Sequence, residues 1–401
     1  MFVPLRRVLP VIIVTILLIY DDRVSIPSCD VVPAVDHEGG LVDEQNHPED
    51  LKVMLVANLL LLGSEAGWAN ICFRDYHLSK FFRKSFEILR PDMLLVLGDV
   101  SARGADLSRS KWSSVVQQFH ELMGPFLSLP FHVTLGDRDI GDCSGLNAES
   151  VSWIASNFPG LDSAGTGAFE ISNISFVSLN AVALACSNNA LRFSVEKIVE
   201  RESIELQMDV EHTKEMINES SKVGLPSVDV GWRENAITSG SGPVVLLHFP
   251  LHQIASNNCL GGNAYEGTST CLHENAKTSK HRRLVETGPY ELSHTLPPNA
   301  TEYIFQALRP RIVFSAHTHR FYDHTHSDGT REITVPAMSW DARNDPGFVV
   351  ASFKRNGRAV TVSHCTLARE SQVVITYVSF LVLFTSTMIL VNKPLLTCKG
   401  R

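Results

Sequence analysis

The chain contains a series of short apolar runs, separated by amphipathic segments and by Gly, Pro or Asp. Their length and their β-branched content are typical of buried strands. The runs cover residues 52–62, 93–98, 131–136, 174–179, 244–248, 312–315 and 348–353. Residues 76–89 and 110–123, between the first three runs, have the apolar spacing of helices. Strands that alternate with helices predict a layered α/β domain.

Both ends of the chain carry a long apolar segment. Residues 8–20 are uncharged and follow Arg6 and Arg7, which predicts a signal anchor over residues 1–22. These 13 residues are fewer than the roughly 20 that span a bilayer, so a cleaved signal peptide is the alternative. Residues 373–391 are also uncharged, and their length predicts a transmembrane helix, with a buried core helix as the alternative.

The distribution of charge predicts how the chain sits in a membrane. Basic residues precede the first apolar segment and follow the second, so the positive-inside rule places both tips in the cytosol, with residues 392–401 as a short tail. The chain between the two segments then faces the lumen. It divides into a polar, Pro-rich linker at 23–50 and a domain at 51–370, which contains a charged and then Ser- and Gly-rich insertion at 200–243.

Two further features concern a lumenal location. Three N-x-S/T sequons support that location only weakly, because a stretch of this length contains one or two by chance: Asn173, Asn218 and Asn299. Cys259 and Cys271 enclose a short Gly- and Asn-rich loop, which predicts a local disulfide, with two free thiols as the alternative.

The composition is that of a folded protein without a nucleic-acid partner. The 401 residues are 44% hydrophobic and 19% charged, enough to bury a large core. The net charge is −8, so the chain lacks the positive field that attracts a phosphate backbone. The membrane is the partner that the apolar segments predict.

Polar side chains follow five of the predicted strands, at the point where each strand ends. Open α/β sheets place their ligand sites at the carboxyl ends of strands. The candidates are Asn58, Asp99, Asp137, His248, His317 and His319. Each alone has a simpler explanation as a turn residue or a hydrogen-bonded histidine. Together they supply carboxylates and imidazoles without a thiolate, which favours a site for Mn, Zn or Fe.

This series resembles the calcineurin-like metallophosphoesterases, whose pattern is D-x-H, G-D, G-N-H-D/E, H and G-H-x-H at successive strand ends. The resemblance covers about residues 51–353 and implies a sandwich of two β-sheets flanked by helices. Residues 57–63, 136–141, 247–251, 315–319 and 335–340 are also similar to the branch that removes ethanolamine phosphate from glycosylphosphatidylinositol (GPI) anchors. That branch implies a phosphorylated glycan or lipid substrate and a place in the endoplasmic reticulum or Golgi membrane.

The chain departs from the family pattern at the first motif. Asn58 and Leu60 stand where the family has the Asp and His of one metal site, so that site keeps only Asp99, His319 and the neutral amide of Asn58. The ligands that the family places in the second metal site are all present: Asp99, Asp137 (an Asn in the family), His248 and His317. One divalent ion is therefore expected, with two as the alternative.

The third motif has Arg138 where the family has a histidine. Arginine stays protonated and cannot act as an acid, but its guanidinium can bind phosphate oxygens. The catalytic candidates are therefore Arg138 and His319. The sequence favours a one-metal phosphodiesterase, and the competing hypothesis is a non-catalytic protein that binds a phosphorylated ligand or a partner as receptor or regulator.

Several other polar residues have less defined roles. Asn180 is expected to orient a loop, and His324 and His326 to be solvated loop residues. Substrate contact and packing both remain open for three residues: His252, Trp340 and Arg343.

Overall fold

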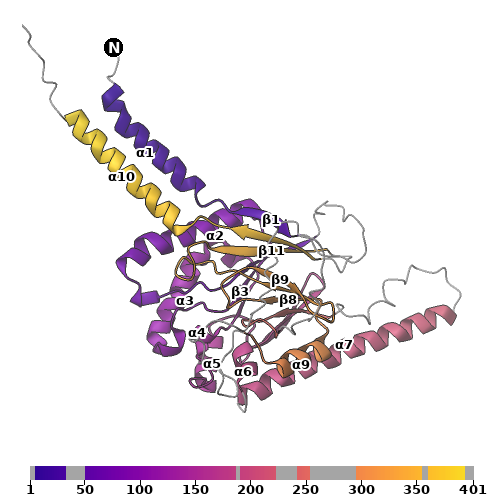
Figure 1. Ribbon diagram of the computed structural model, residues 1–401. Coiled ribbons are helices and arrows are strands. Elements are labelled where there is room, and N and C mark those ends of the chain that lie inside the picture. The colour runs from indigo at the N-terminus through magenta and orange to yellow at the C-terminus, as the bar shows by residue number, and fades with distance from the viewer. Residues whose placement is uncertain are drawn as a thin grey trace, which may run out of the picture.

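The computed structural model describes residues 5–32, 50–186, 190–222, 242–252, 295–354 and 360–392. Two six-stranded sheets form the centre of the domain, and helices lie outside them (Figure 1). The predicted disulfide between Cys259 and Cys271 lies outside the described residues, as do residues 223–241 of the predicted insertion.

The first sheet contains three parallel strands at one side and antiparallel strands at the other. Strands β2, β3 and β4 are parallel, and β11, β12 and β1 continue the sheet in antiparallel pairs. The order is β1 (Ser28–Val32), β12 (Val360–Thr366), β11 (Gly347–Phe353), β2 (Leu51–Val56), β3 (Met93–Leu97) and β4 (Phe131–Thr134). Four predicted strands are confirmed here, although β2 ends six residues before the predicted run.

The second sheet has a parallel centre and antiparallel edges. Strands β6, β7, β8 and β10 are parallel, while β5 and β9 pair antiparallel with their neighbours. The order is β5 (Gly167–Ile171), β6 (Ile174–Ser178), β7 (Val244–Leu246), β8 (Ile312–Ser315), β10 (Arg331–Thr334) and β9 (Tyr322–Thr325). The three strands predicted in this sheet, β6, β7 and β8, are confirmed.

The inner faces of the sheets pack against each other. Alternate residues of the central strands are fully buried there, among them Val53 and Leu55 of β2, Phe176 of β6 and Phe314 of β8. The opposite residues, such as Met54 and Val56, face the helices. Strands buried on both faces read as continuous apolar runs, which is why these elements could be predicted from the sequence.

Helices cover the outer faces. Helix α2 begins and ends as predicted, and α3 begins one residue early. Helix α2 buries His77, Leu78, Phe81 and Phe82 along one face, which is the spacing of an amphipathic helix. The helices of the domain are η1 (Gly63–Glu65), the π-helix η2 (Asn70–Asp75), α2 (Tyr76–Leu89), η3 (Gly104–Asp106), α3 (Arg109–Met123), η4 (Gly124–Ser128), α4 (Asp137–Ile140), α5 (Ala148–Ala155), α6 (Ala181–Ala185), α7 (Ala190–Lys222) and α9 (Pro298–Leu308).

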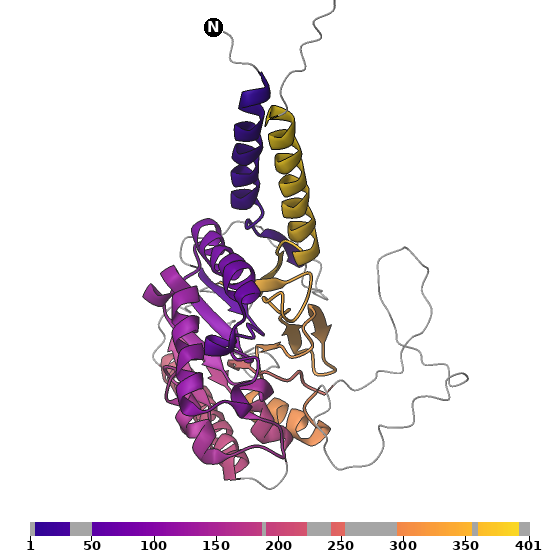
Figure 2. The same ribbon diagram turned by 90° about the vertical axis from the view of Figure 1, so that its left-hand side faces the viewer.

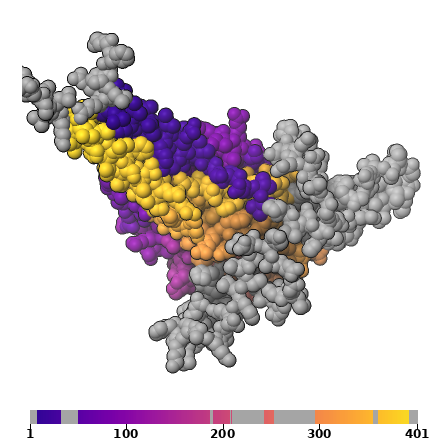
Figure 3. Space-filling model, turned by 45° about the horizontal axis from the view of Figure 1, so that its top comes forward, coloured from indigo at the N-terminus to yellow at the C-terminus, as the bar shows by residue number. Residues whose placement is uncertain are grey.

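Two terminal helices project together from the domain. Helices α1 (Leu5–Arg23) and α10 (Glu370–Asn392) lie side by side (Figures 2 and 3). Residues Glu370–Val391 of α10 form an apolar segment long enough to cross a membrane, and only 11% of its most apolar part is buried. Among the described helices α10 alone meets that criterion, and α1, which has charges at both ends, does not.

A disulfide connects β1 to the end of the domain. Cys29 lies opposite Cys365 in the β1–β12 register, and their sulfur atoms are bonded. Residues 28–32, predicted to be linker, are therefore part of the first sheet. The sequence SCDVV forms a largely exposed edge strand without an apolar run, so its pattern did not identify it. The rest of the predicted linker, 33–49, lies outside the described residues.

This disulfide predicts how a cleaved chain behaves. After cleavage at a protease site introduced within residues 33–49, the N-terminal fragment is expected to stay attached on a non-reducing denaturing gel and to separate when reductant is added. In Cys29→Ser it should separate without reductant. Separation of the cleaved wild-type chain without reductant would contradict the Cys29–Cys365 pairing.

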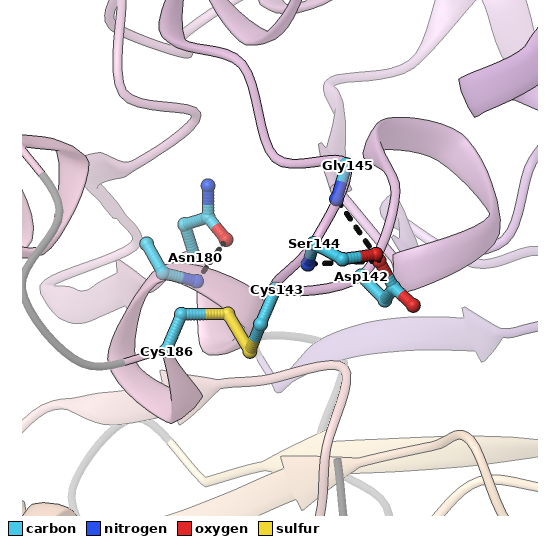
Figure 4. Close-up of a disulfide and its surroundings, with 7 residues drawn as sticks. Asp142, Cys143, Ser144, Gly145, Asn180 and Cys186 are labelled. Atoms are coloured by element: carbon cyan, nitrogen blue, oxygen red, sulfur yellow. Dashed lines mark hydrogen bonds between the residues drawn. A yellow bond between two sulfur atoms is a disulfide. The ribbon is translucent and has the colours of Figure 1, made fainter. Parts of the chain in front are cut away.

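A second disulfide, between Cys143 and Cys186, was not predicted. It joins the loop after α4 to the end of α6 (Figure 4). Asn180 lies nearby, where its Oδ1 accepts a hydrogen bond from Ala183 N and its Nδ2 donates to the carbonyl of Ala164. The prediction that Asn180 orients a loop is confirmed.

Candidate metal centre

The carboxyl ends of strands from both sheets meet at one edge of the sandwich. Asp99 follows β3, Asp137 follows β4, His248 follows β7, and His317 follows β8. Ligand atoms of Asp137, His248 and His317 all lie within 4.8 Å of one another. Asp99 is adjacent, because its Oδ1 is 3.4 Å from His248 Nε2. The structure thus brings together the four residues that the sequence assigned to one metal site.

Two glycines make this close approach sterically feasible. A Cβ on Gly98 would lie 2.3 Å from Nδ1 of His248, and a Cβ on Gly136 would lie 2.2 Å from Oδ1 of Asp99. Two of the candidate ligands, Asp99 and His317, have left-handed backbone conformations with φ of 52° and 63°. Such backbone strain in non-glycine residues is concentrated at functional sites.

His248 is oriented as a metal ligand. Its ring is fully buried, and Nδ1 is 2.8 Å from the carbonyl oxygen of Leu97, which can only accept. The proton therefore lies on Nδ1, and Nε2 faces Asp137 Oδ1 at 3.0 Å. A backbone carbonyl that fixes the histidine tautomer in this way is the usual support for a metal-binding imidazole.

The charges in the centre compensate one another. Burial raises the pKa of Asp99 to about 6, while the nearby His248 opposes this shift. Burial would also raise the pKa of Asp137, but hydrogen bonds with His248 and His317 hold that pKa well below its usual value. Burial acts to lower the pKa of His248, and the two carboxylates raise it to about 9. Without an ion, a proton on His248 balances the carboxylates, and a divalent cation fits the same donor set.

At the position of the family's other metal, Asn58 and His319 bond to each other. The amide Nδ2 of Asn58 lies 2.7 Å from Nδ1 of His319, and Leu60 is 4% exposed. Since an amide nitrogen can only donate, Nδ1 of His319 accepts this hydrogen bond. Burial and the positive charge of Arg138 lower the pKa of His319 to about 4, which keeps the ring neutral. The expectation that this site is damaged stays a prediction.

Arg138 places a permanent positive charge beside Asp99. Its Nε lies 3.5 Å from Asp99 Oδ2, and its backbone N donates to Asp99 Oδ1 at 3.1 Å. The guanidinium is close enough to His319 for its positive charge to lower the pKa of that ring. The side chain is 43% exposed, so it can also contact a substrate. Arg138 is thus a positively charged neighbour of Asp99, on the side of Asp99 that faces Oδ2.

Asp139 holds the two ligand loops together. Its carboxylate is fully buried and accepts hydrogen bonds from the backbone N–H groups of Val100, Ser101 and Gly136, at 3.3, 2.8 and 3.0 Å. These donors belong to the loops that carry Asp99 and Asp137. Asp139 therefore lies in the interior, whereas the neighbouring Arg138 is half-exposed.

A buried hydrogen bond between His326 and Glu332 supports the loop after β7. His326 Nε2 lies 2.7 Å from Glu332 Oε2, and Glu332 Oε1 accepts a hydrogen bond from Leu251 N. The prediction that His326 is a solvated loop residue is wrong, because the side chain is 8% exposed. The sequence showed only a short polar hairpin here, so nothing indicated that Glu332 turns inward.

The remaining candidates lie outside the centre. Trp340 is buried, stacks on Phe73 and donates from Nε1 to the carbonyl of Ala368, which favours packing. Arg343 pairs with Asp345, three residues after Trp340 along the same loop. His252 N donates to Thr301 Oγ1.

The comparisons with known proteins agree with this architecture. The family described as calcineurin-like phosphoesterase matches residues 71–321, and the chain belongs to this family. The two-sheet α/β sandwich and the cluster of metal-binding side chains are those of a metallophosphoesterase.

Relatives that carry a metallophosphoesterase name are similar to most of the chain. The chain is 27% identical to Metallophosphoesterase 1 of Xenopus laevis over 84% of its length and 79% of the relative, and 28% identical to that of Pongo abelii over 84% and 77%. It also resembles a dimetal phosphatase from Danio rerio, with 14% identity, a TM-score of 0.40, and coverage of 80% of this chain and 99% of that one.

Proposed function

We propose that this chain is a membrane-anchored metallophosphoesterase with one divalent ion, which hydrolyses a phosphodiester. The observation that carries the proposal is the geometry of the two metal positions. Asp99, Asp137, His248 and His317 converge, whereas at the other position Asn58 replaces a carboxylate and is hydrogen-bonded to His319.

We assign metal binding, charge stabilisation and substrate positioning to different residues of the site. Asp99, Asp137, His248 and His317 would hold the ion, which would supply Lewis acidity toward a phosphoryl oxygen and lower the pKa of a water molecule. Arg138 stabilises negative charge on the phosphoryl oxygens, because its guanidinium is exposed and stays protonated. His319 is neutral and hydrogen-bonded, so we assign it to substrate positioning.

The terminal helices support a place in a membrane. We infer that α1 and α10 both cross the bilayer, with the domain on the lumenal side and both termini in the cytosol, in the endoplasmic reticulum or Golgi. The apolar segment of α10, the pairing of α1 with α10 and the basic residues at both ends support this topology.

The substrate is proposed from the motifs. Residues 136–141, 247–251 and 315–319 resemble the GPI-remodelling branch, which removes ethanolamine phosphate from the GPI glycan. We therefore propose this phosphodiester as the substrate, and a role in GPI-anchor remodelling during transport from the endoplasmic reticulum to the Golgi.

A second function is favoured by Leu60 and Arg138. Leu60 is buried where the family has a histidine ligand, and Arg138 cannot donate a proton to a leaving group. The same domain could therefore bind a phosphorylated glycan or lipid without cleaving it, as a receptor or regulator.

Restoration of the family motifs distinguishes the two functions. In the variant Asn58→Asp, Leu60→His, Arg138→His, we expect a second ion to bind and phosphodiester cleavage to rise by roughly 100-fold, the scale at which one electrostatic group contributes to a transition state. The measurement is hydrolysis of an ethanolamine-phosphate diester by the full chain in detergent with Mn²⁺. Cleavage by the wild type that His248→Ala abolishes supports the enzyme, and cleavage only by the restored variant supports the binding protein.

A further inference from the structure

Three apolar side chains are exposed where the chain enters α2. Trp68 is 80% exposed, Ile71 56% and Tyr76 48%. We call these three residues the η2 rim, because Ile71 lies in the π-helix η2 and the other two flank it. Exposed apolar groups that lie together mark a contact surface.

The η2 rim lies beside the two terminal helices. Tyr76 donates from its hydroxyl to Asp21 Oδ2 of α1 at 3.1 Å. Arg74 of η2 donates from Nε to Glu370 Oε1 of α10 at 2.8 Å. The ring of Phe73, also in η2, is 6.3 Å from the ring of Tyr377. Contacts with both helices therefore fix the position of η2 and its rim along the axis of the helix pair.

This position coincides with the start of the apolar segment of α10. Tyr377 lies seven residues after Glu370, or about 10 Å along α10 at 1.5 Å per residue. The apolar stretch begins at Val373, between these two residues. Since Phe73 is level with Tyr377, η2 lies where α10 enters its apolar part, and Figure 2 shows α2 beside the base of the helix pair.

We propose that the η2 rim rests in the headgroup region of the bilayer that α10 crosses. The occupant of this surface is lipid, because the rim continues the surface of the helix pair, and because Trp and Tyr favour the membrane–water interface. The inference rests on the proposed membrane placement. It adds a third contact, away from the helix axes, that prevents the domain from tilting.

Packing contacts and a hydrogen bond connect η2, which carries the rim, to the metal centre. Phe73 stacks on Trp340 with ring centroids 5.4 Å apart. Three residues earlier, Ala337 N donates to the carbonyl of His319 at 3.2 Å. A rim held in the interface therefore sets the orientation of the metal centre relative to the membrane surface.

Quenching of Trp68 by lipid tests the proposal. The full chain is reconstituted into phosphatidylcholine vesicles with brominated acyl chains, and the emission of Trp68 is obtained as the difference between wild type and Trp68→Phe. We expect this component to be blue-shifted and quenched by bromolipid. The component removed by Trp153→Phe, in α5 beside Arg109, should be insensitive to bromolipid.

A charge at the rim provides a second test. Ile71→Glu is expected to shift the Trp68 emission to the red and to reduce its quenching, whereas Phe193→Glu, at a residue of α7 that is 70% exposed, should leave both unchanged. An unquenched Trp68 in vesicle-embedded protein overturns the proposal and assigns the rim to a protein partner or a second copy. Protein that an alkaline wash removes from the vesicles refutes the membrane anchoring itself, which separates the two failures.

Discussion

The His248→Ala variant is expected to lose the metal ion entirely, from about one ion per chain in the wild type. The variant removes a buried imidazole whose Nε2 faces both carboxylates and whose tautomer is fixed by Leu97. Loss of a ligand lowers affinity by more than the roughly 10- to 100-fold that loss of a supporting residue costs. Elemental analysis of the purified full chain measures the stoichiometry.

His319→Ala is the matched control. It also removes a histidine that follows a strand, but Nδ1 of His319 is already hydrogen-bonded to Asn58. The ion should therefore remain bound in this variant. Equal loss of metal from both variants, or about two ions in the wild type, would show that His319 is a ligand and that the first metal position is intact.

Asp139→Ala is expected to destabilise the domain by about 3–5 kcal/mol, because a buried carboxylate that satisfies three backbone donors is removed. Val100, Ser101 and Gly136 would each keep a buried N–H group without an acceptor. The thermal unfolding of the full chain in detergent, followed by circular dichroism, measures the loss.

Asp142→Ala serves as the comparison, since Asp142 is exposed and accepts hydrogen bonds from the N–H groups of Ser144 and Gly145 at 3.0 Å. Water can replace this carboxylate, so the expected loss is within about 1 kcal/mol. If the two variants are equally stable, Asp139 does not hold the ligand loops together.

The cluster of candidate metal ligands could be predicted because each of its residues follows a strand that is buried on both faces. Asp99 and His248 come after apolar runs that read as strands without any structure, and the carboxyl ends of parallel strands share an edge. The departures at Leu60 and Arg138 were equally visible, since they change the chemistry of recognisable motifs.

The supporting interactions could not be predicted, because they depend on which way a side chain points. Glu332 lies on β10, a four-residue strand with a polar start, and only the structure shows it turned toward Leu251 and His326. The strand β1 was missed for the opposite reason. It is an exposed edge strand, and its pairing depends on a partner 336 residues away.

That separation has a consequence for biosynthesis. Cys365 is made 336 residues after Cys29, which takes roughly 20 to 70 s at 5–20 residues per second. In the lumenal placement proposed above, Cys29 spends this interval in an oxidising compartment before its partner is made. Cys143 and Cys186 are only 43 residues apart, so they can pair earlier. The disulfide that joins β1 to β12 can therefore form only after the one between Cys143 and Cys186 has become possible, because Cys365 is the last of the four cysteines to be made.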